Sequence, residues 1–353
     1  MTSKRIRVVI VDDSLVAREM LSQILSSDPD IEVVGTAADG QAGVDMVAQL
    51  KPDLVTMDIH MPRMDGLDAV ENIMAHTPTP VLVVSSSVHG EGLGVAFEAL
   101  TAGALEVMKK PEPKDWEDLE RIGREIIRKV KILARVRVIR HIRGRLRVGS
   151  NRPPIVGPTV LPASAAGISL VAVGSSTGGP SALMLLLSSL PKDFPVPVLI
   201  AQHIADGFIP GLVEWLNGGC AIHVREAGDA ATIEPGSAYL APTGRNLEFD
   251  GHRTHFTTPK AGQLYIPSAD TLFESVAASM RSQAVGVILT GMGNDGARGL
   301  KAMHDLGAKT VGQDEATSTV YGMPRAAAEL GAVDLALPID KIAGAVMAFV
   351  AGA

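Results

Sequence analysis

The chain has 353 residues, 46% of them hydrophobic and 20% charged, which is the balance of a globular protein with room for about two domains. Apolar runs stay shorter than the ~20 residues of a membrane span, and the single cysteine, Cys220, excludes internal disulfides and cysteine-based structural zinc. The net charge of -7 hides a basic block, because residues 121–147 contain eleven Lys or Arg and one acid, or +10, which leaves -17 for the rest. The lone cysteine and an N-terminus unlike a signal peptide predict a cytoplasmic protein with no direct membrane insertion.

Strand and helix patterns alternate through the first third of the chain. Short apolar runs predict five strands, at residues 5–11, 31–34, 54–57, 81–84 and 105–108. Apolar residues at helical spacing predict helices at residues 14–26, 42–50, 67–75 and 92–102, and a last one from Trp116 onward. This alternation favours right-handed βαβ units and a parallel sheet covered by helices on both faces.

The last of these helices runs into the basic block, with an apolar stripe that continues to Val136. Four prolines then fall within residues 148–167, which predicts an extended linker. The expected organisation is therefore a first domain at residues 4–122, a basic helical and then Pro-rich linker at residues 123–167, and a second domain at residues 168–353.

The second half repeats the α/β pattern. Strands are predicted at residues 169–173, 196–202, 238–241, 285–290 and 309–312, with shorter edge or antiparallel strands at 222–225 and 247–257. Helices are predicted at residues 180–189, 211–217, 268–280, 296–306, 324–330 and 341–350. The fold class expected for the whole chain is α/β, with two doubly wound domains built on mainly parallel sheets.

Charged and polar side chains follow four of the five strands of the first domain. Asp12 and Asp13 follow the first strand and Asp58 the third, while Ser85 and Lys110 end the fourth and fifth. In a parallel sheet these strand ends border one crevice. Clustered carboxylates need a divalent cation, and their oxygen ligands suit Mg²⁺. Any one of these residues is as readily an ordinary loop residue, but the set predicts a carboxylate arranged to attack phosphorus and hold an acyl phosphate.

These residues resemble a response-regulator receiver domain. The matching segments are Val11-Asp12-Asp13-Ser14, Met57-Asp58-Ile59-His60-Met61-Pro62, Met64-Asp65-Gly66, Ser85 and Lys110-Pro111. The resemblance implies that Asp58 is the phosphoacceptor and that a histidine kinase is the phosphodonor. It also implies the remaining roles: a Mg²⁺ site from Asp13, Asp58 and the His60 carbonyl, helped through water by Asp12, a switch hydroxyl on Ser85, and a phosphoryl contact from Lys110.

A serine-bearing turn opens the second domain. The segment Gly174-Ser175-Ser176-Thr177-Gly178-Gly179-Pro180 follows a predicted strand and precedes a helix. The spacing Gly174-x-Ser176-x-Gly178 fits a tight turn that exposes a serine hydroxyl at the positive end of that helix. Such glycine- and serine-rich turns more often bind phosphate or simply reverse the chain, so the motif needs support from a base.

The base and its partner are expected from two later strand ends. His203 is the one histidine of nine that directly follows a long apolar strand. Asp295 lies in a glycine-rich segment after the strand at residues 285–290, just before another helix. Ser176, His203 and Asp295 are therefore predicted to meet at one edge of one sheet as nucleophile, general base and orienting carboxylate.

The second half resembles the chemotaxis protein-glutamate methylesterases, the CheB family. The matching segments are Gly174–Gly179, Gln202-His203, residues 284–297 and Tyr321-Gly322-Met323-Pro324-Arg325, and the order receiver, basic linker, hydrolase also agrees. The resemblance implies hydrolysis of glutamyl methyl esters on methyl-accepting chemotaxis receptors and deamidation of receptor glutamines. It carries over Ser176, His203 and Asp295 as catalytic residues and the Met292 backbone amide as part of the oxyanion hole, with no cofactor for ester hydrolysis.

Two other readings remain open at this point. The basic block could bind DNA as part of a transcriptional regulator, although a solvated linker helix is the simpler interpretation and no DNA partner is expected. The triad could also serve a small-molecule esterase or deacetylase, which leaves the receiver unexplained. For the methylesterase, the hypothesis that joins the two halves is an unphosphorylated receiver that covers the hydrolase crevice until Asp58 is phosphorylated.

Overall fold

The computed structural model describes residues 4–86, 93–138 and 167–352. The chain divides into two compact units, Met1–Asn151 and Arg152–Ala353. Both are α/β units with parallel sheets, as the sequence predicts. Among the described residues, no helix combines the length and the apolar character that crossing a membrane requires.

The first unit is built on a five-stranded sheet with the order β2-β1-β3-β4-β5, in which every pair is parallel. Its strands are β1 (Ile6–Val11), β2 (Ile31–Ala37), β3 (Leu54–Met57), β4 (Val81–Ser85) and β5 (Glu106–Lys109). Its helices are α1 (Leu15–Ser26), α2 (Gly40–Leu50), α3 (Gly66–His76), α4 (Leu93–Thr101) and α5 (Trp116–Leu133). The order places β1 and β3 side by side, so the residues that follow them meet at one edge.

Helix α5 belongs to the core of the first unit. Ile126, Val130 and Leu133 are fully buried and pack in the same cluster as Leu25 of α1. The apolar stripe of α5 is thus covered by its own unit as far as Leu133, beyond the boundary expected at residue 122. The Pro-rich part of the expected linker falls mostly on residues 139–166, which lie outside the described residues.

The second unit is built on a seven-stranded parallel sheet with the order β14-β13-β12-β6-β7-β9-β8. Its strands are β6 (Leu170–Ser175), β7 (Val198–Gln202), β8 (His223–Glu226), β9 (Ser237–Leu240), β12 (Ala284–Ile288), β13 (Lys309–Gln313) and β14 (Leu335–Leu337). The strand order reverses between β6 and β12, and such a switch point leaves a crevice at the carboxyl ends of the strands.

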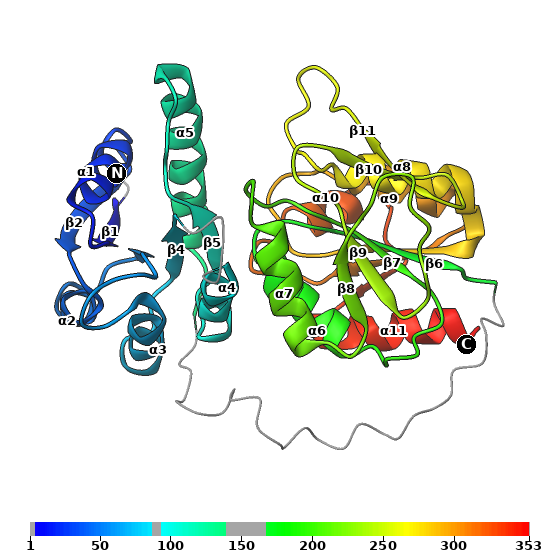
Figure 1. Cartoon of the computed structure of the whole chain (residues 1–353), viewed down its shortest axis with the longest axis horizontal. Coiled ribbons are helices and arrows are strands. Elements are labelled where there is room, and N and C mark those ends of the chain that lie inside the picture. Colours follow the sequence, from blue (N-terminus) through cyan, green and yellow to red (C-terminus); the bar gives the residue numbers. More distant parts are fainter. Residues whose placement is uncertain (1–3, 87–92, 139–166, 353) are drawn as a thin grey trace. The chain divides into compact units, whose positions relative to one another are not determined.

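Helices cover both faces of this sheet (Figure 1). On one side lie α6 (Gly179–Ser188), α7 (Ile209–Gly219) and α11 (Ile339–Ala351). On the other lie α8 (Ala269–Met280), α9 (Ala297–Asp305) and α10 (Met323–Glu329), and a single turn of 3₁₀ helix, Arg281–Gln283, follows α8. Buried side chains from this second group, among them Phe273, Leu300 and Met323, form one core cluster with strands of the sheet.

Two short elements of the second unit compare differently with the prediction: the antiparallel pair agrees with it, and one strand was missed. The segment predicted at residues 247–257 is a separate antiparallel hairpin of β10 (Asn246–Phe249) and β11 (Thr254–Thr257), broken at Gly251, where φ is +100°. The strand β14 was not predicted. Its sequence, Leu335-Ala336-Leu337, is apolar, but a run of three residues is too short to be told from a loop by its pattern.

Candidate functional site

Three aspartates gather where β1 and β3 end. Asp12 follows β1 and Asp58 follows β3, and the Asp58 amide donates to the Val11 carbonyl at 2.9 Å. Carboxylate oxygens of Asp12, Asp13 and Asp58 lie within 4.8 Å of one another. Asp12 and Asp58 are 1% and 3% exposed, whereas Asp13 faces solvent. The predicted acidic crevice therefore exists, with two of its carboxylates buried.

Lys110 supplies the positive charge at this crevice. Its Nζ lies 2.8 Å from Oδ2 of Asp12 and 3.1 Å from Oδ2 of Asp58. Burial raises the pKa of Asp58, and the repulsion of Asp12 adds to this, so that the pKa stays raised although the Lys110 charge lowers it. Burial alone would lower the pKa of Lys110, but its bonds to both carboxylates raise it. The positive charge of Lys110 thus only partly offsets the negative charges of Asp12 and Asp58 and the effect of burial.

The other expected residues lie on neighbouring strand ends or in the loop after Asp58. Ser85 is buried at the end of β4, and its carbonyl accepts from the Lys110 amide at 2.9 Å. His60, two residues after Asp58, is exposed. Gly66 closes this loop against the strand, because a Cβ at that position would lie 1.9 Å from the Asp58 carbonyl oxygen. Hard oxygen donors on a rigid turn are what Mg²⁺ prefers, so the donor set fits that cation.

In the second unit, Ser176 and His203 follow paired strand ends. Ser175 and Gln202 are register partners at the ends of β6 and β7, and the His203 amide donates to the Ser175 carbonyl at 3.0 Å. Ser176 and His203 are both half-buried. The backbone positions of the expected nucleophile and base are thereby fixed next to each other by the sheet itself.

Gln202 holds this arrangement together, a role that sequence reasoning missed. Its side-chain amide donates to the carbonyls of Ser176 and His203 at 2.9 and 2.8 Å, and its oxygen accepts from the Ser175 hydroxyl at 2.6 Å. Gly179 is necessary here, because a Cβ there would lie 2.0 Å from that oxygen. A polar residue that ends a buried strand just before the candidate base is the signal that could have found it.

His203 and Asp295 form a direct pair. Nε2 of His203 lies 2.8 Å from Oδ2 of Asp295. The other ring nitrogen, Nδ1, is buried and makes no hydrogen bond within the described part of the chain, so no bond to Ser176 is formed. When the proton shared with Asp295 is on Nε2 of a neutral imidazole, Nδ1 carries no proton and can accept one from a nucleophile.

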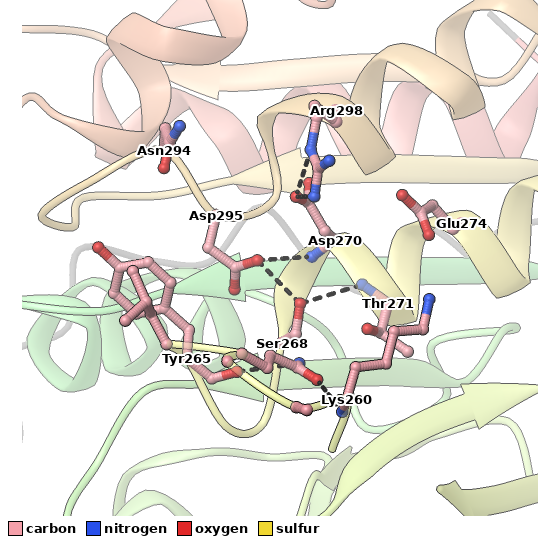
Figure 2. Close-up of a pocket in the computed structure, with 13 residues that line it drawn as sticks. Lys260, Tyr265, Ser268, Asp270, Thr271, Glu274, Asn294, Asp295 and Arg298 are labelled. Carbon is pink, nitrogen blue, oxygen red and sulfur yellow. Dashed lines mark hydrogen bonds and ion pairs between the residues drawn. The ribbon is translucent and has the colours of Figure 1, made fainter. Parts of the chain in front are cut away.

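Asp295 is held by the start of α8 (Figure 2). Its carboxylate accepts from the Ser268 hydroxyl at 2.8 Å and from the amides of Ala269 and Asp270 at 2.6 and 3.2 Å. Burial would raise the pKa of Asp295, but the His203 bond and these donors outweigh it and lower the pKa. Asp295 therefore stays ionised while buried, as an imidazole-orienting carboxylate must.

The loop from Thr290 to Asp295 packs against the serine turn. The Ser176 amide donates to the Thr290 carbonyl at 3.0 Å. A Cβ on Gly291 would lie 2.7 Å from Cβ of Ser176, so the loop backbone can approach this closely only with glycine. The amides of Gly322 and Met323 donate to the Gly291 carbonyl at 3.1 and 2.9 Å, so the motif at residues 321–325 supports the loop. The half-buried Met292 follows directly.

Tyr265, also missed from the sequence, stacks on His203. The two ring centroids lie 4.8 Å apart and the planes differ by 9°. Tyr265 and Asp295 also line a cavity of about 590 Å³ together with charged side chains, which include Lys260, Glu274 and Arg298 (Figure 2). Asp295 and the ring that stacks on His203 thus border a polar cavity.

Comparisons with known proteins agree with both units. The family model of the CheB methylesterase matches residues 171–346, and that of the response regulator receiver domain matches residues 8–119. Protein-glutamate methylesterase/protein-glutamine glutaminase 2 of Anaeromyxobacter dehalogenans is 44% identical over 337 residues, which is 96% of this chain and 95% of that protein. The corresponding protein 4 of Geobacter metallireducens is 44% identical over 340 residues, 96% of each chain.

A crystal structure of the Thermotoga maritima CheB methylesterase catalytic domain is 33% identical to this chain, covers 51% of it and 97% of that domain, and has a TM-score of 0.48. The two family matches define a response regulator whose second unit is an enzyme domain. The chain belongs to the CheB family of protein-glutamate methylesterases/protein-glutamine glutaminases.

Proposed function

We propose that this chain hydrolyses glutamyl methyl esters on methyl-accepting chemotaxis receptors, deamidates receptor glutamines, and is regulated by phosphorylation of its receiver. Its relatives, named protein-glutamate methylesterase/protein-glutamine glutaminase, suggest the reaction. The observation that carries the proposal is the His203–Asp295 pair at 2.8 Å beside the turn that bears Ser176. We propose residues 4–122 as the receiver, 123–167 as the segment between the units, which begins with the buried end of α5 and continues as a linker, and 168–353 as the hydrolase.

Ester cleavage then needs only side chains and amides of the second unit. Ser176 Oγ attacks the ester carbonyl while His203 takes its proton at Nδ1, and Asp295 stabilises the imidazolium. The Met292 amide binds the oxyanion. Methanol leaves with the proton from His203, and a water activated by the same imidazole releases the glutamate and regenerates Ser176. A hydrogen bond between nucleophile and base often tightens only once substrate is bound.

Glutamine deamidation follows the same route, because the amide carbonyl meets the same nucleophile and ammonia replaces methanol as the leaving group. No cofactor takes part in either reaction of this proposal.

In the receiver, Asp58 attacks phosphorus and becomes the acyl phosphate, with a histidine kinase as donor. Asp12, Asp13, Asp58 and the His60 carbonyl would hold Mg²⁺, which supplies positive charge against the developing phosphoryl charge. Lys110 lies within 3.1 Å of Asp58 and is placed to contact the phosphoryl oxygens, and the Ser85 hydroxyl is proposed as the switch. The cluster of carboxylate oxygens within 4.8 Å supports this assignment.

Methanol release from methylated receptor membranes tests the proposal. Ser176→Ala should lower the rate by at least about 10³-fold, because nucleophile and base act as a unit. The same variant should still take up phosphate from a small-molecule donor, and Asp58→Asn should not. A phosphodonor should raise methanol release by the wild type and leave Asp58→Asn unchanged. Turnover that survives in Ser176→Ala would rule out the serine mechanism.

The substrate class is tested with the same preparations. Hydrolysis of a simple acyl ester at a rate comparable to that of methylated receptor would point to a general esterase. We expect a strong preference for the receptor, lost together with ester hydrolysis in Ser176→Ala.

A further inference from the structure

We propose that Tyr265 is a positioning residue for the hydrolase: its ring sets the plane of the His203 imidazole, and so directs Nδ1 toward the serine. This inference rests on the proposed function and adds to it a residue outside the triad. Tyr265 lies in the segment between β11 and α8, far from His203 in the sequence, and is half-buried.

The need for such a residue follows from how His203 is held. Its ring has one hydrogen bond, from Nε2 to Asp295, and Nδ1 has none to any described residue. A single bond at one edge of a ring fixes the distance but leaves the ring able to rock about the line of that bond. The face of Tyr265, 4.8 Å away and within 9° of parallel, blocks that rotation.

The phenol also reaches the loop that carries Asp295. Gly293 has φ of +91°, and a Cβ there would lie only 2.2 Å from the Tyr265 hydroxyl oxygen. The loop backbone therefore passes directly against the end of the ring. The Tyr265 side chain thus contacts both His203 and the loop from Gly291 to Asp295. Gly291, at one end of that loop, packs on Ser176, and Asp295, at the other end, is bonded to His203.

Tyr265 need not exchange a proton with the substrate for this role. It acts through the geometry of His203, so its loss should slow the chemical step and leave substrate binding largely intact. The ring is the part that stacks, and the hydroxyl is the part that meets the loop. Removing them separately distinguishes the two contacts.

The test uses full-length Tyr265→Phe and Tyr265→Leu in methanol release from methylated receptor membranes. Leu should lower kcat by about 10- to 100-fold, the range that a misplacement of roughly 1 Å produces, with KM unchanged within about twofold. Phe keeps the stacked ring and should stay within about threefold of wild type. If Leu does not fold, as judged by circular dichroism, Tyr265→Met replaces it as a ring-free side chain of similar length.

A second readout is the rate at which a fluorophosphonate labels Ser176, which depends on the base but not on receptor docking. Labelling should fall in Leu or Met and be restored in Phe, while phosphate uptake at Asp58 stays at the wild-type level in all variants. Unchanged kcat in Leu, a rise in KM alone, or equal losses in Phe and Leu would each overturn the inference. Failure of the proposed function is a different result, in which Ser176→Ala and wild type release methanol equally.

Discussion

Two buried aspartates in loops that follow strands, one in each unit, have pKa values that move in opposite directions. Burial by itself acts to raise the pKa of each. Asp58 shares its crevice with Asp12 and, among the residues that the structure describes, has Lys110 as its one cationic partner, and its pKa stays raised. Asp295 accepts bonds from His203, the Ser268 hydroxyl and backbone amides, and its pKa is lowered. The number of donors around each carboxylate decides the direction.

The difference separates two uses of a buried carboxylate. A carboxylate with too little positive charge around it is suited to bind a cation, because the cation relieves the repulsion and then also offsets the charge of a phosphoryl group added there. A carboxylate already surrounded by protein donors gains little from a cation, and serves instead as a fixed anion beside an imidazole. The receiver crevice and the hydrolase crevice share sheet geometry and differ in this electrostatic balance.

The largest expected effect comes from removing the fixed anion. Asp295→Asn keeps the size of the side chain but loses the charge that orients His203, and should lower kcat for ester hydrolysis by about 10³- to 10⁴-fold. Methanol release measures it. The matched control is Asp250→Asn, because Asp250 pairs with His255 at 2.7 Å through the same atoms but on the exposed hairpin. Equal losses in both variants would show that the buried pair has no special role.

A glycine comparison tests the packing of the two crevices. In Gly66→Ala the new Cβ would lie 1.9 Å from the Asp58 carbonyl oxygen, and its next neighbours are also backbone atoms. Because backbone cannot step aside, the free energy of unfolding should fall by about 1–3 kcal/mol or more. In Gly291→Ala the closest atom is Sδ of Met323, a flexible side chain, at 2.3 Å. It should therefore lose less stability than Gly66→Ala while still slowing hydrolysis, because Cβ of Ser176 is also displaced.

Scanning calorimetry of the full chain measures the stability changes, and methanol release and phosphate uptake measure the functional ones. Phosphate uptake should fall in Gly66→Ala alone and hydrolysis in the absence of a phosphodonor should fall in Gly291→Ala alone. A Gly66→Ala protein with the wild-type transition temperature would contradict the close approach of that loop to Asp58.

The opposite pKa shifts predict opposite pH dependence of stability. For Asp58, whose pKa is raised on folding, the favourable contribution is complete below the unfolded pKa of ~3.9 and is lost as pH rises through the folded value. Asp58→Asn should thus melt at a higher temperature than wild type at pH 7, and the gap should close toward pH 4. For Asp295, the contribution is present above ~3.9 and is lost as pH falls through the lowered value.

Thermal unfolding across this pH range decides the point. A lower melting temperature for Asp58→Asn at pH 7 would mean that Lys110 more than offsets the burial and repulsion of Asp58. Magnesium chloride should raise the melting temperature of wild type more than that of Asp58→Asn, because a cation that binds only the folded site stabilises it.

The sequence predicts a site best where strand ends alone determine it. Asp12, Asp58 and Lys110 follow predicted strands directly, and the sheet brings them together within hydrogen-bonding distance. His203 follows β7 in the same way, and Asp295 reaches it from the glycine-rich loop between β12 and α9. The donors that set their properties do not follow from strand order.

Ser268 and Tyr265 come from the segment before α8, which approaches the crevice from outside the sheet. No local pattern encodes that approach, because it depends on how α8 packs across the strands. The length of α5 follows from its apolar stripe, which predicts a helix that continues past residue 122, but only packing shows that residues up to Leu133 are buried within the first unit.

The smallest expected effect on stability comes from replacing a glycine at a position that does not require one. Gly344 lies on the exposed side of α11, and a Cβ there would meet nothing within 4 Å. Glycine costs a helix interior about 0.8–1.0 kcal/mol relative to alanine, so Gly344→Ala should raise the unfolding free energy by up to that amount. Calorimetry should show a slightly higher transition for the second unit only, with hydrolysis unchanged. A destabilised Gly344→Ala would instead mean that this face of α11 is covered by another surface, because alanine is harmful there only if something occupies the space beside the helix.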